Sequence, residues 1–157
     1  GVRFVPVTTA AEMRDAVLKE FPHSTAVLMA AAGTDYRPRK GSASKLKRGD
    51  GTMELTLEPN PDILKELGQT KRAQTLIGFA AETGDVVAKA VPKRRSKGCD
   101  WMVANDVAPG TETFGGLDNT VHLITDRGVE DWPRMTKQEV AKRLAERIAG
   151  HFEAAGG

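Results

Sequence analysis

Lysines recur every four residues in one charged stretch of the sequence, at Lys89, Lys93 and Lys97. Residues four apart lie on the same face of an α-helix, so these side chains would form one row of ammonium groups. Such a row beside a crevice could reach a bound nucleotide. A solvated surface is the other interpretation, and the spacing alone favours it.

A second concentration of charge lies in the stretch 33–51, which has no clear helix or strand pattern. A loop of that length in a compact domain is usually functional or mobile. Its cations would suit phosphate, because ammonium and guanidinium groups form strong charge-assisted hydrogen bonds with phosphate oxygens. The charged residues of this stretch include Asp35, Arg37, Arg39, Lys40, Lys45, Lys47 and Arg48.

The segment 78–83, GFAAET, follows the apolar residues Leu76 and Ile77 and reads as a buried strand that runs into a helix. A strand that only fills a core would more often carry β-branched residues in place of Ala80 and Ala81. Small side chains would allow a flat base to lie against the strand end and to read its backbone N–H and C=O groups. Close packing of a helix on the strand explains the same residues equally well.

The elements that would position these groups alternate along the chain. The continuous apolar run at 25–32 indicates a strand covered on both faces, and residues 120–125 and 128–132 could pair as a hairpin. Further strands are expected at 52–58, 75–81 and 101–106, and helices at 9–21, at 60–68, from 83 onward and at 136–152. This alternation predicts a single Rossmann-like α/β domain over residues 1–157, with three layers, a mainly parallel sheet and an antiparallel edge hairpin.

Capping patterns predict where the helices begin and end. Thr9 with Glu12, and Thr136 with Glu139, have the spacing of capping boxes. The helix at 60–68 is expected to have Asn60 as its N-cap, Pro61 as its first residue and Gly68 as its C-terminal stop. In open α/β sheets, ligands bind beyond the carboxyl ends of the strands. The segments predicted to lie there are Asp35, 60–64, 79–83 and Asn105-Asp106.

Composition narrows the function classes. A chain of 157 residues can form one ordinary domain. Its net charge of +2 is too small to indicate binding to nucleic acid or to an anionic membrane. Aromatic residues make up only 5%, too few for a stacking platform that binds single strands. No apolar run could span a membrane, and the single Cys99 favours a reducing compartment, so we predict the cytoplasm. His23, His122 and His151 are too widely spaced to suggest a metal site.

Short motifs occur in a characteristic order along the chain: AAAGTDYRP, SKLKR, NPDIL, GFAAET and ANDV. In this order and spacing they resemble the phosphopantothenoylcysteine synthetase family of coenzyme A biosynthesis. The segments FGGLDNTVHLI and PRMTKQEVA extend the resemblance over nearly the whole chain. In bacteria this synthetase domain is often fused behind a flavin-dependent decarboxylase, so FMN is expected only in such a fused domain and not in this chain.

The resemblance implies a phosphopantothenate–cysteine ligase that uses CTP. The carboxylate of phosphopantothenate attacks the α-phosphate of CTP, giving an acyl-cytidylate and pyrophosphate, and cysteine then displaces CMP. Magnesium is expected to arrive with the nucleotide, because it normally keeps waters and phosphate oxygens as ligands. A homodimer is also implied, in which each long loop reaches towards the partner's site, and we expect its interface to use Phe114 to Ile124.

The family's functional residues can be carried onto matching positions of this sequence. Lys45 is the expected catalytic residue, on a loop that closes over the triphosphate. Asp35 would orient the nucleotide or share its cation, Asp62 would hold the ribose or the base, and Phe79 would line the base pocket. The complete implied nucleotide site consists of Asp35, Lys45, Pro61, Asp62, Ile63, Leu64, Phe79, Lys93 and Lys97.

Several departures from the family pattern bear on activity. Gly33-Thr34 replaces Val-Ala, Leu46 and Arg48 replace Ile and Lys, and Pro92 should kink the helix just before Lys93. The family's Gly-Gly-Thr turn and Ser-Ser-Gly-Lys segment do not occur in this sequence. We therefore expect the chain to be the C-terminal part of a synthetase domain that is inactive alone. A nucleotide-binding module without catalysis, or a dimerisation module, are the alternatives.

Overall fold

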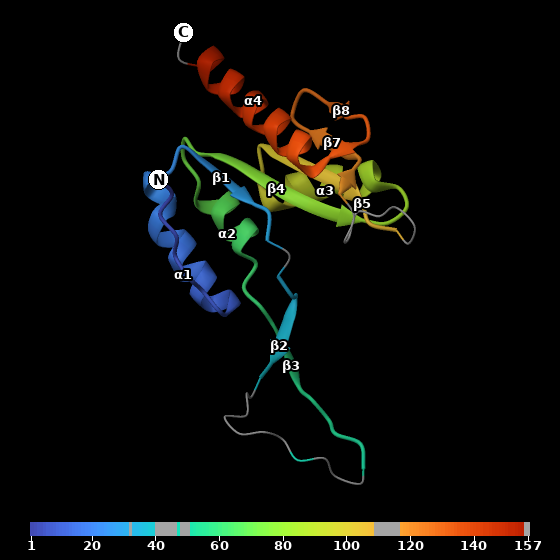
Figure 1. Ribbon diagram of the computed structural model, residues 1–157. Helices are drawn as coiled ribbons and strands as arrows, with labels where there is room; N and C mark the ends of the chain where they lie inside the picture. Colours follow the sequence, from blue (N-terminus) through green and yellow to red (C-terminus); the bar gives the residue numbers. More distant parts are fainter. Residues whose placement is uncertain (32, 40–46, 48–50, 109–116, 156–157) are drawn as a thin grey trace.

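The computed structural model describes residues 1–31, 33–39, 47, 51–108 and 117–155. Its centre is a five-stranded sheet in the order β1-β4-β5-β7-β8 (Figure 1). Strands β1, β4 and β5 are parallel, whereas β7 and β8 form an antiparallel hairpin at one side. The strands of this sheet are β1 (Ala26–Met29), β4 (Thr75–Glu82), β5 (Trp101–Asp106), β7 (Val121–Ile124) and β8 (Val129–Asp131).

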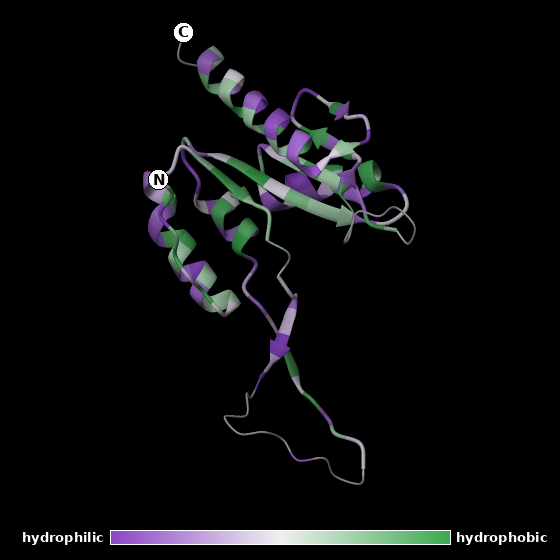
Figure 2. Ribbon diagram, in the orientation of Figure 1, coloured by the Kyte–Doolittle hydropathy of each residue, from purple (hydrophilic) through white to green (hydrophobic). Residues whose placement is uncertain are grey.

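Helices cover both faces of this sheet and complete the three layers. Three of them, α1 (Ala10–Glu20), α2 (Ile63–Thr70) and α3 (Val86–Lys97), pack on one face, where their apolar residues share a core with Leu76 and Met102. On the other face, α4 (Lys137–Ala155) packs on Ile77, Trp101 and Leu123. Figure 2 shows α4 alternating between hydrophilic and hydrophobic residues, as expected of a helix with one buried side. The predicted Rossmann-like α/β fold with an antiparallel edge hairpin is confirmed.

A two-stranded arm leaves this body between β1 and α2. It consists of β2 (Tyr36–Pro38) and β3 (Leu57–Pro59), paired antiparallel, and it points away from the central sheet (Figure 1). Arg37 bridges the two strands through an ion pair of 2.8 Å with Glu58. A second small sheet, formed by β6 (Asp118–Asn119) and β9 (Met135–Thr136), joins the hairpin region to the start of α4.

Two strand predictions were wrong, one in the burial of the strand and one in its bounds. β1 is not covered on both faces, because Leu28 remains 45% exposed. The reason is that α4 packs on β4, β5 and β7, whereas only Val27 and Met29 of β1 face a helical layer. The strand expected at 52–58 is shorter in the structure, which has β3 at Leu57–Pro59, paired with β2.

Helix starts were predicted correctly where the cap is purely local. The Thr9–Glu12 and Thr136–Glu139 capping boxes both form. The predicted start of α2 was wrong, because Asp62 and not Asn60 caps this helix. Its predicted end was also wrong, because Gly68 lies inside the helix. The helix expected from residue 83 onward begins later, because Asp85 caps α3 and Val86 is its first residue. α3 continues through Pro92 and ends at Lys97. A short 3-10 helix, η1 (Phe21–His23), follows α1.

Candidate functional site

The predicted site residues on α2 and α3 meet through an ion pair between Asp62 and Lys97. Asp62 lies at the first turn of α2, where its Oδ1 accepts a hydrogen bond of 3.1 Å from the backbone N–H of Lys65. Its other oxygen, Oδ2, accepts from the ammonium group of Lys97 at the last turn of α3. Partial burial raises the pKa of Asp62, but the hydrogen bonds from Lys97 and from the Lys65 amide outweigh it, so the pKa is lowered. Asp62 is therefore held as a carboxylate.

The other lysines of the predicted row bind the end of β4. Lys93 Nζ lies 3.0 Å from Glu82 Oε1, and Lys89 Nζ donates to the Thr83 carbonyl at 2.5 Å. Lys89, Lys93 and Lys97 thus lie on one face of α3, as their spacing predicted. Lys93 and Lys97 are not a freely solvated face, since both side chains are partly buried against carboxylates.

The two carboxylate–lysine pairs give this surface a mixed charge. Asp62 and Glu82 balance Lys93 and Lys97, so the four groups carry no net charge when ionised. Such a cluster offers hydrogen-bond donors and acceptors side by side, which suits the polar edges of a base and ribose. Glu82 was absent from the predicted site residues, although it belongs to the GFAAET motif. The sequence does not reveal that Glu82 pairs with Lys93, because Glu82 ends β4 and Lys93 lies in α3.

The end of β4 exposes one backbone edge next to these pairs. β1 ends at Met29, opposite Gly78, whereas β4 continues to Glu82, as Figure 1 shows. Within the described part of the chain, no strand pairs with β4 on the β1 side beyond Gly78. A row of backbone hydrogen-bonding groups is therefore open at the carboxyl end of the parallel sheet, where α/β proteins bind ligands.

The orientation of these backbone groups follows from the neighbouring strand. The Glu82 carbonyl accepts a hydrogen bond of 2.9 Å from Val107 N–H, on the β5 side of β4. Backbone groups of successive residues point to alternate sides of a strand. The carbonyl of Phe79 and the N–H and carbonyl of Ala81 therefore face the open side.

Of the two interpretations of the small residues in GFAAET, the contacts of Gly78 and Ala80 fit close packing of a helix on the strand. A Cβ placed on Gly78 would lie 2.9 Å from Leu64 Cδ2 and 3.1 Å from Cys99 Sγ, so Gly78 accommodates close packing of α2 on the sheet. Ala80 is buried in the same core. The side chain of Phe79 packs with the core on the α4 face, opposite to Lys93 and Lys97. Close helix–strand packing thus explains Gly78 and Ala80, and only the backbone of Phe79 and Ala81 is open to a ligand beside the lysines.

The base of the arm brings two more predicted segments together. The Asn60 N–H donates to the Asp35 carbonyl at 2.8 Å, and Asn60 Nδ2 donates to the Thr34 carbonyl at 2.8 Å. Asn60 is therefore occupied by this contact, which explains why it does not cap α2. The backbone of Asp35 therefore lies beside Asn60, two residues before Asp62. Lys45, the predicted catalytic residue, lies outside the described residues.

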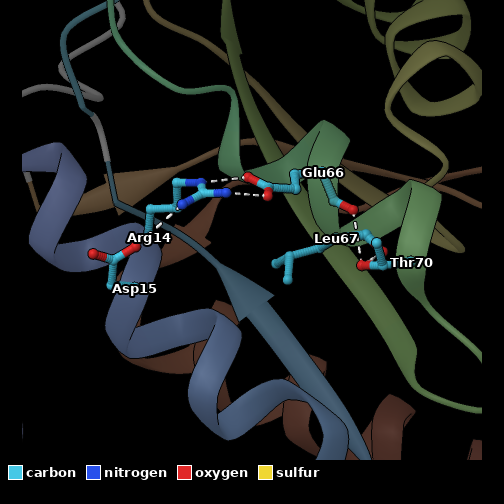
Figure 3. Close-up of polar contacts among 5 residues, drawn as sticks. All are labelled: Arg14, Asp15, Glu66, Leu67 and Thr70. Atoms are coloured by element: carbon cyan, nitrogen blue, oxygen red, sulfur yellow. Dashed lines mark hydrogen bonds and ion pairs between the residues drawn. The ribbon is translucent and has the colours of Figure 1, made fainter.

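α2 is also fixed from the side of α1. The guanidinium of Arg14 binds both carboxylate oxygens of Glu66, with N···O distances of 2.7 and 2.5 Å (Figure 3). Figure 3 further shows that Leu67 and Thr70 continue the same helix, and Leu67 is fully buried. The position of Asp62 therefore rests on a helix held by several contacts.

A hollow of about 420 Å³ lies at the first turn of α3, and neither lysine–carboxylate pair lines it. None of the predicted nucleotide-binding residues lines it. The convergent polar groups, rather than this hollow, locate the candidate site, because hydrogen-bonding groups determine which ligand is selected. The residues that line the hollow are Gly84, Asp85, Val86, Val87, Asp106, Thr120 and His122.

Potential metal ligands do not cluster among the described residues. No group of three or more His, Cys, Asp or Glu side chains there could hold an ion. Asp35, which the family resemblance assigns to the nucleotide or its cation, is exposed. No helix among the described residues has both the length and the apolar character needed to cross a bilayer.

A known protein-family model matches most of the chain. The model of the DNA/pantothenate metabolism flavoprotein C-terminal domain matches residues 1–152. The chain belongs to this family.

Curated members of the family resemble the chain over most of its length. It is 41% identical over 147 residues to the coenzyme A biosynthesis bifunctional protein CoaBC of Bacillus subtilis, covering 93% of this chain and 36% of that protein. It is 34% identical over 149 residues to a cysteine/cysteine sulfinic acid decarboxylase of an unknown prokaryotic organism, covering 94% and 42%. The chain thus spans less than half the length of these relatives.

A solved structure has the same fold. The crystal structure of the C-terminal domain of the coenzyme A biosynthesis bifunctional protein CoaBC is 34% identical, with a TM-score of 0.76. The match covers 96% of this chain and 66% of that one. The resemblance to the synthetase domain of the bifunctional coenzyme A protein, first drawn from the sequence motifs, is confirmed.

Proposed function

We propose that this chain forms the CTP-binding part of a phosphopantothenate–cysteine ligase of coenzyme A biosynthesis. The observation that carries the proposal is the meeting of Asp62, Lys97, Lys93 and Glu82 beside the open backbone edge of β4. The family membership and the likeness to the CoaBC C-terminal domain support it.

In the proposed reaction, a carboxylate oxygen of phosphopantothenate attacks the α-phosphorus of CTP and pyrophosphate leaves. The amine of cysteine then attacks the acyl carbon, CMP leaves, and the amine loses a proton. The chain described here would supply mainly the nucleoside side of the site. Its neutral lysine–carboxylate cluster suits base and ribose, whereas the triphosphate and its magnesium ion would meet Asp35 and the cationic stretch that contains Lys45.

Cytosine selection follows from the open edge of β4. Cytosine presents an amino donor next to a ring-nitrogen acceptor, and the edge offers both carbonyls and an N–H at Phe79 and Ala81. We place the amino group of cytosine at the Phe79 carbonyl and its ring nitrogen N3 at the Ala81 N–H. In this register uracil would set O4 against the Phe79 carbonyl and N3–H against the Ala81 N–H, so both backbone groups would lose their partners, which costs binding energy. We therefore expect CTP to bind better than UTP or ATP.

Calorimetric titration of the full-length protein with CTP, UTP and ATP at fixed magnesium tests this proposal. The expected result is preferential CTP binding, together with CTP-dependent formation of pyrophosphate and phosphopantothenoylcysteine. Equal affinity for the three nucleotides would refute a cytosine site. Preferential CTP binding without ligation would favour a nucleotide-binding module without catalysis.

We also propose that the active form is a homodimer. The described part of the arm exposes Tyr36, Met53, Leu55 and Leu57, and exposed apolar groups of this kind mark interaction surfaces. In the predicted interface from Phe114 to Ile124, the apolar side chains of β7 are buried within the chain's own sheet. Sedimentation of the full-length protein at micromolar concentration should give a dimer, and replacing Leu55 and Leu57 by serine should weaken it. A monomer would refute dimerisation.

A further inference from the structure

α2 and α3 touch through their backbones at two glycines. A Cβ added to Gly68, inside α2, would lie 1.9 Å from the carbonyl oxygen of Lys97. Gly98 meets the same place from the other side, where its added Cβ would lie 3.0 Å from Gly68 Cα. Gly98 also has φ +68, a left-handed conformation that glycine adopts readily at the end of a helix. Neither helix has room for a side chain at this crossing.

The residue that Gly68 touches is the one that carries the site's ammonium group. Lys97 contacts α2 twice, through its backbone carbonyl at Gly68 and through its Nζ at Asp62. Both contacts fall on one short helix, Ile63–Thr70 with its cap Asp62. The separation of the two helices at Gly68 therefore sets the distance between the ammonium group of Lys97 and the carboxylate of Asp62.

The remaining contacts of α2 leave little freedom to absorb a change at the crossing. Leu64 packs on the space above Gly78, and Glu66 is bound by Arg14 on the opposite side. To move from 1.9 Å to the 3.4 Å of ordinary contact, a Cβ at Gly68 would have to separate the two helices by about 1.5 Å. A hydrogen bond weakens steeply over such a distance.

We propose that Gly68 and Gly98 are positioning residues of the nucleotide site, because their contact places Lys97 against Asp62. This inference rests on the proposed function for its effect on CTP, but the geometry of the Asp62–Lys97 pair does not depend on it. The glycines touch no ligand. They act through the spacing of two helices that each contribute one charged group.

Graded glycine substitutions test the proposal in the full-length protein. Gly68→Ala introduces the larger wedge. Gly98→Asn introduces a smaller one, since asparagine tolerates a left-handed backbone and its Cβ would meet Gly68 at 3.0–3.2 Å. Gly150→Ala in α4 is the matched control, because nothing lies within 4 Å of its added Cβ.

The first measurement is the pKa of the Asp62 carboxyl by carbon-detected NMR, without nucleotide. Because Lys97 lowers this pKa, it should rise towards its ordinary value in Gly68→Ala, rise less in Gly98→Asn and stay unchanged in Gly150→Ala. An unchanged Asp62 pKa in both wedge variants would overturn the proposal, whether or not CTP binds. If Gly68→Ala does not fold, as thermal unfolding would show, Gly98→Asn decides the question alone.

The second measurement is CTP affinity in a double-mutant cycle. Gly68→Ala should weaken CTP binding by about tenfold, the lower range for one charge-assisted contact, and should cause no further loss when Lys97→Ala is already present. An equal loss in both backgrounds would mean that Gly68 acts through general packing and would overturn the proposal. If the wild-type protein does not bind CTP, the proposed function fails, and the Asp62 titration still decides the role of the glycines.

Discussion

Replacing Lys97 by alanine removes the ammonium group that binds Asp62 and, in the proposed site, the nucleoside. The Lys97 side chain is 26% exposed, so its contact is partly shielded from water. A hydrogen bond to a charged group contributes about 1.5–3 kcal/mol where it is made. We therefore expect CTP affinity to fall about ten- to a hundredfold.

Because the charges of the site balance, we can predict which part of the nucleotide loses binding energy in Lys97→Ala. Lys97 is neutralised by Asp62, and Lys93 by Glu82, so neither lysine should discriminate strongly between mono-, di- and triphosphate. Lys97→Ala should weaken CMP, CDP and CTP by the same factor, as calorimetry at fixed ionic strength can measure. A loss that grows with the number of phosphates would show that Lys97 binds the triphosphate and would refute the neutral-cluster reasoning.

Arg95→Ala is the control that matches this change in net charge. Arg95 is exposed on another face of α3, and its removal should leave affinity nearly unchanged. Arg94 is unsuitable as a control, because its Nη1 donates to the carbonyls of Cys99 and Asp100 and closes the end of α3. An Arg95→Ala loss as large as that of Lys97→Ala would point to long-range electrostatics instead of a contact.

Further predictions concern stability and reactivity. Leu67 is 0% exposed, so Leu67→Ala should lower the free energy of unfolding by about 2–5 kcal/mol in urea titrations. The hydrogen bond from Arg14 lowers the pKa of Glu66; the stabilisation is therefore present above the ordinary glutamate pKa and is lost as pH falls through the lowered value, so the Tm deficit of Arg14→Ala should shrink in acid. Burial raises the pKa of the Cys99 thiol to about 11, so native protein should react slowly with a disulfide reagent at pH 8 and rapidly once unfolded.

The sequence predicted those features that depend on neighbouring residues. The buried strands around Ile77 and Val103 were recognisable from continuous apolar runs, and the Thr9–Glu12 box from a spacing of three. The row of lysines on α3 followed from helical periodicity alone. These patterns are local, so no knowledge of the tertiary structure was needed to interpret them.

Features that depend on distant contacts were missed or misassigned. Asn60 resembles an N-cap, but its side chain binds the Thr34 carbonyl, so the cap falls to Asp62. Gly68 resembles a helix stop, but it is small because Lys97 of another helix lies against it. The pairing of Glu82 with Lys93 could not be predicted from the sequence either, since only the fold brings the end of β4 next to α3.

The open end of β4 gives one strand two kinds of amide hydrogen. At Ile77 and Gly78 the strand has neighbours on both edges, so these amides should exchange with solvent deuterium only when the sheet itself opens. The Ala81 amide, which faces the open side, should exchange from the native state within the same strand. A ligand that bonds to this edge would slow exchange at Ala81 without altering the protected amides a few residues away. The strand thus contains its own internal reference for occupancy of the site.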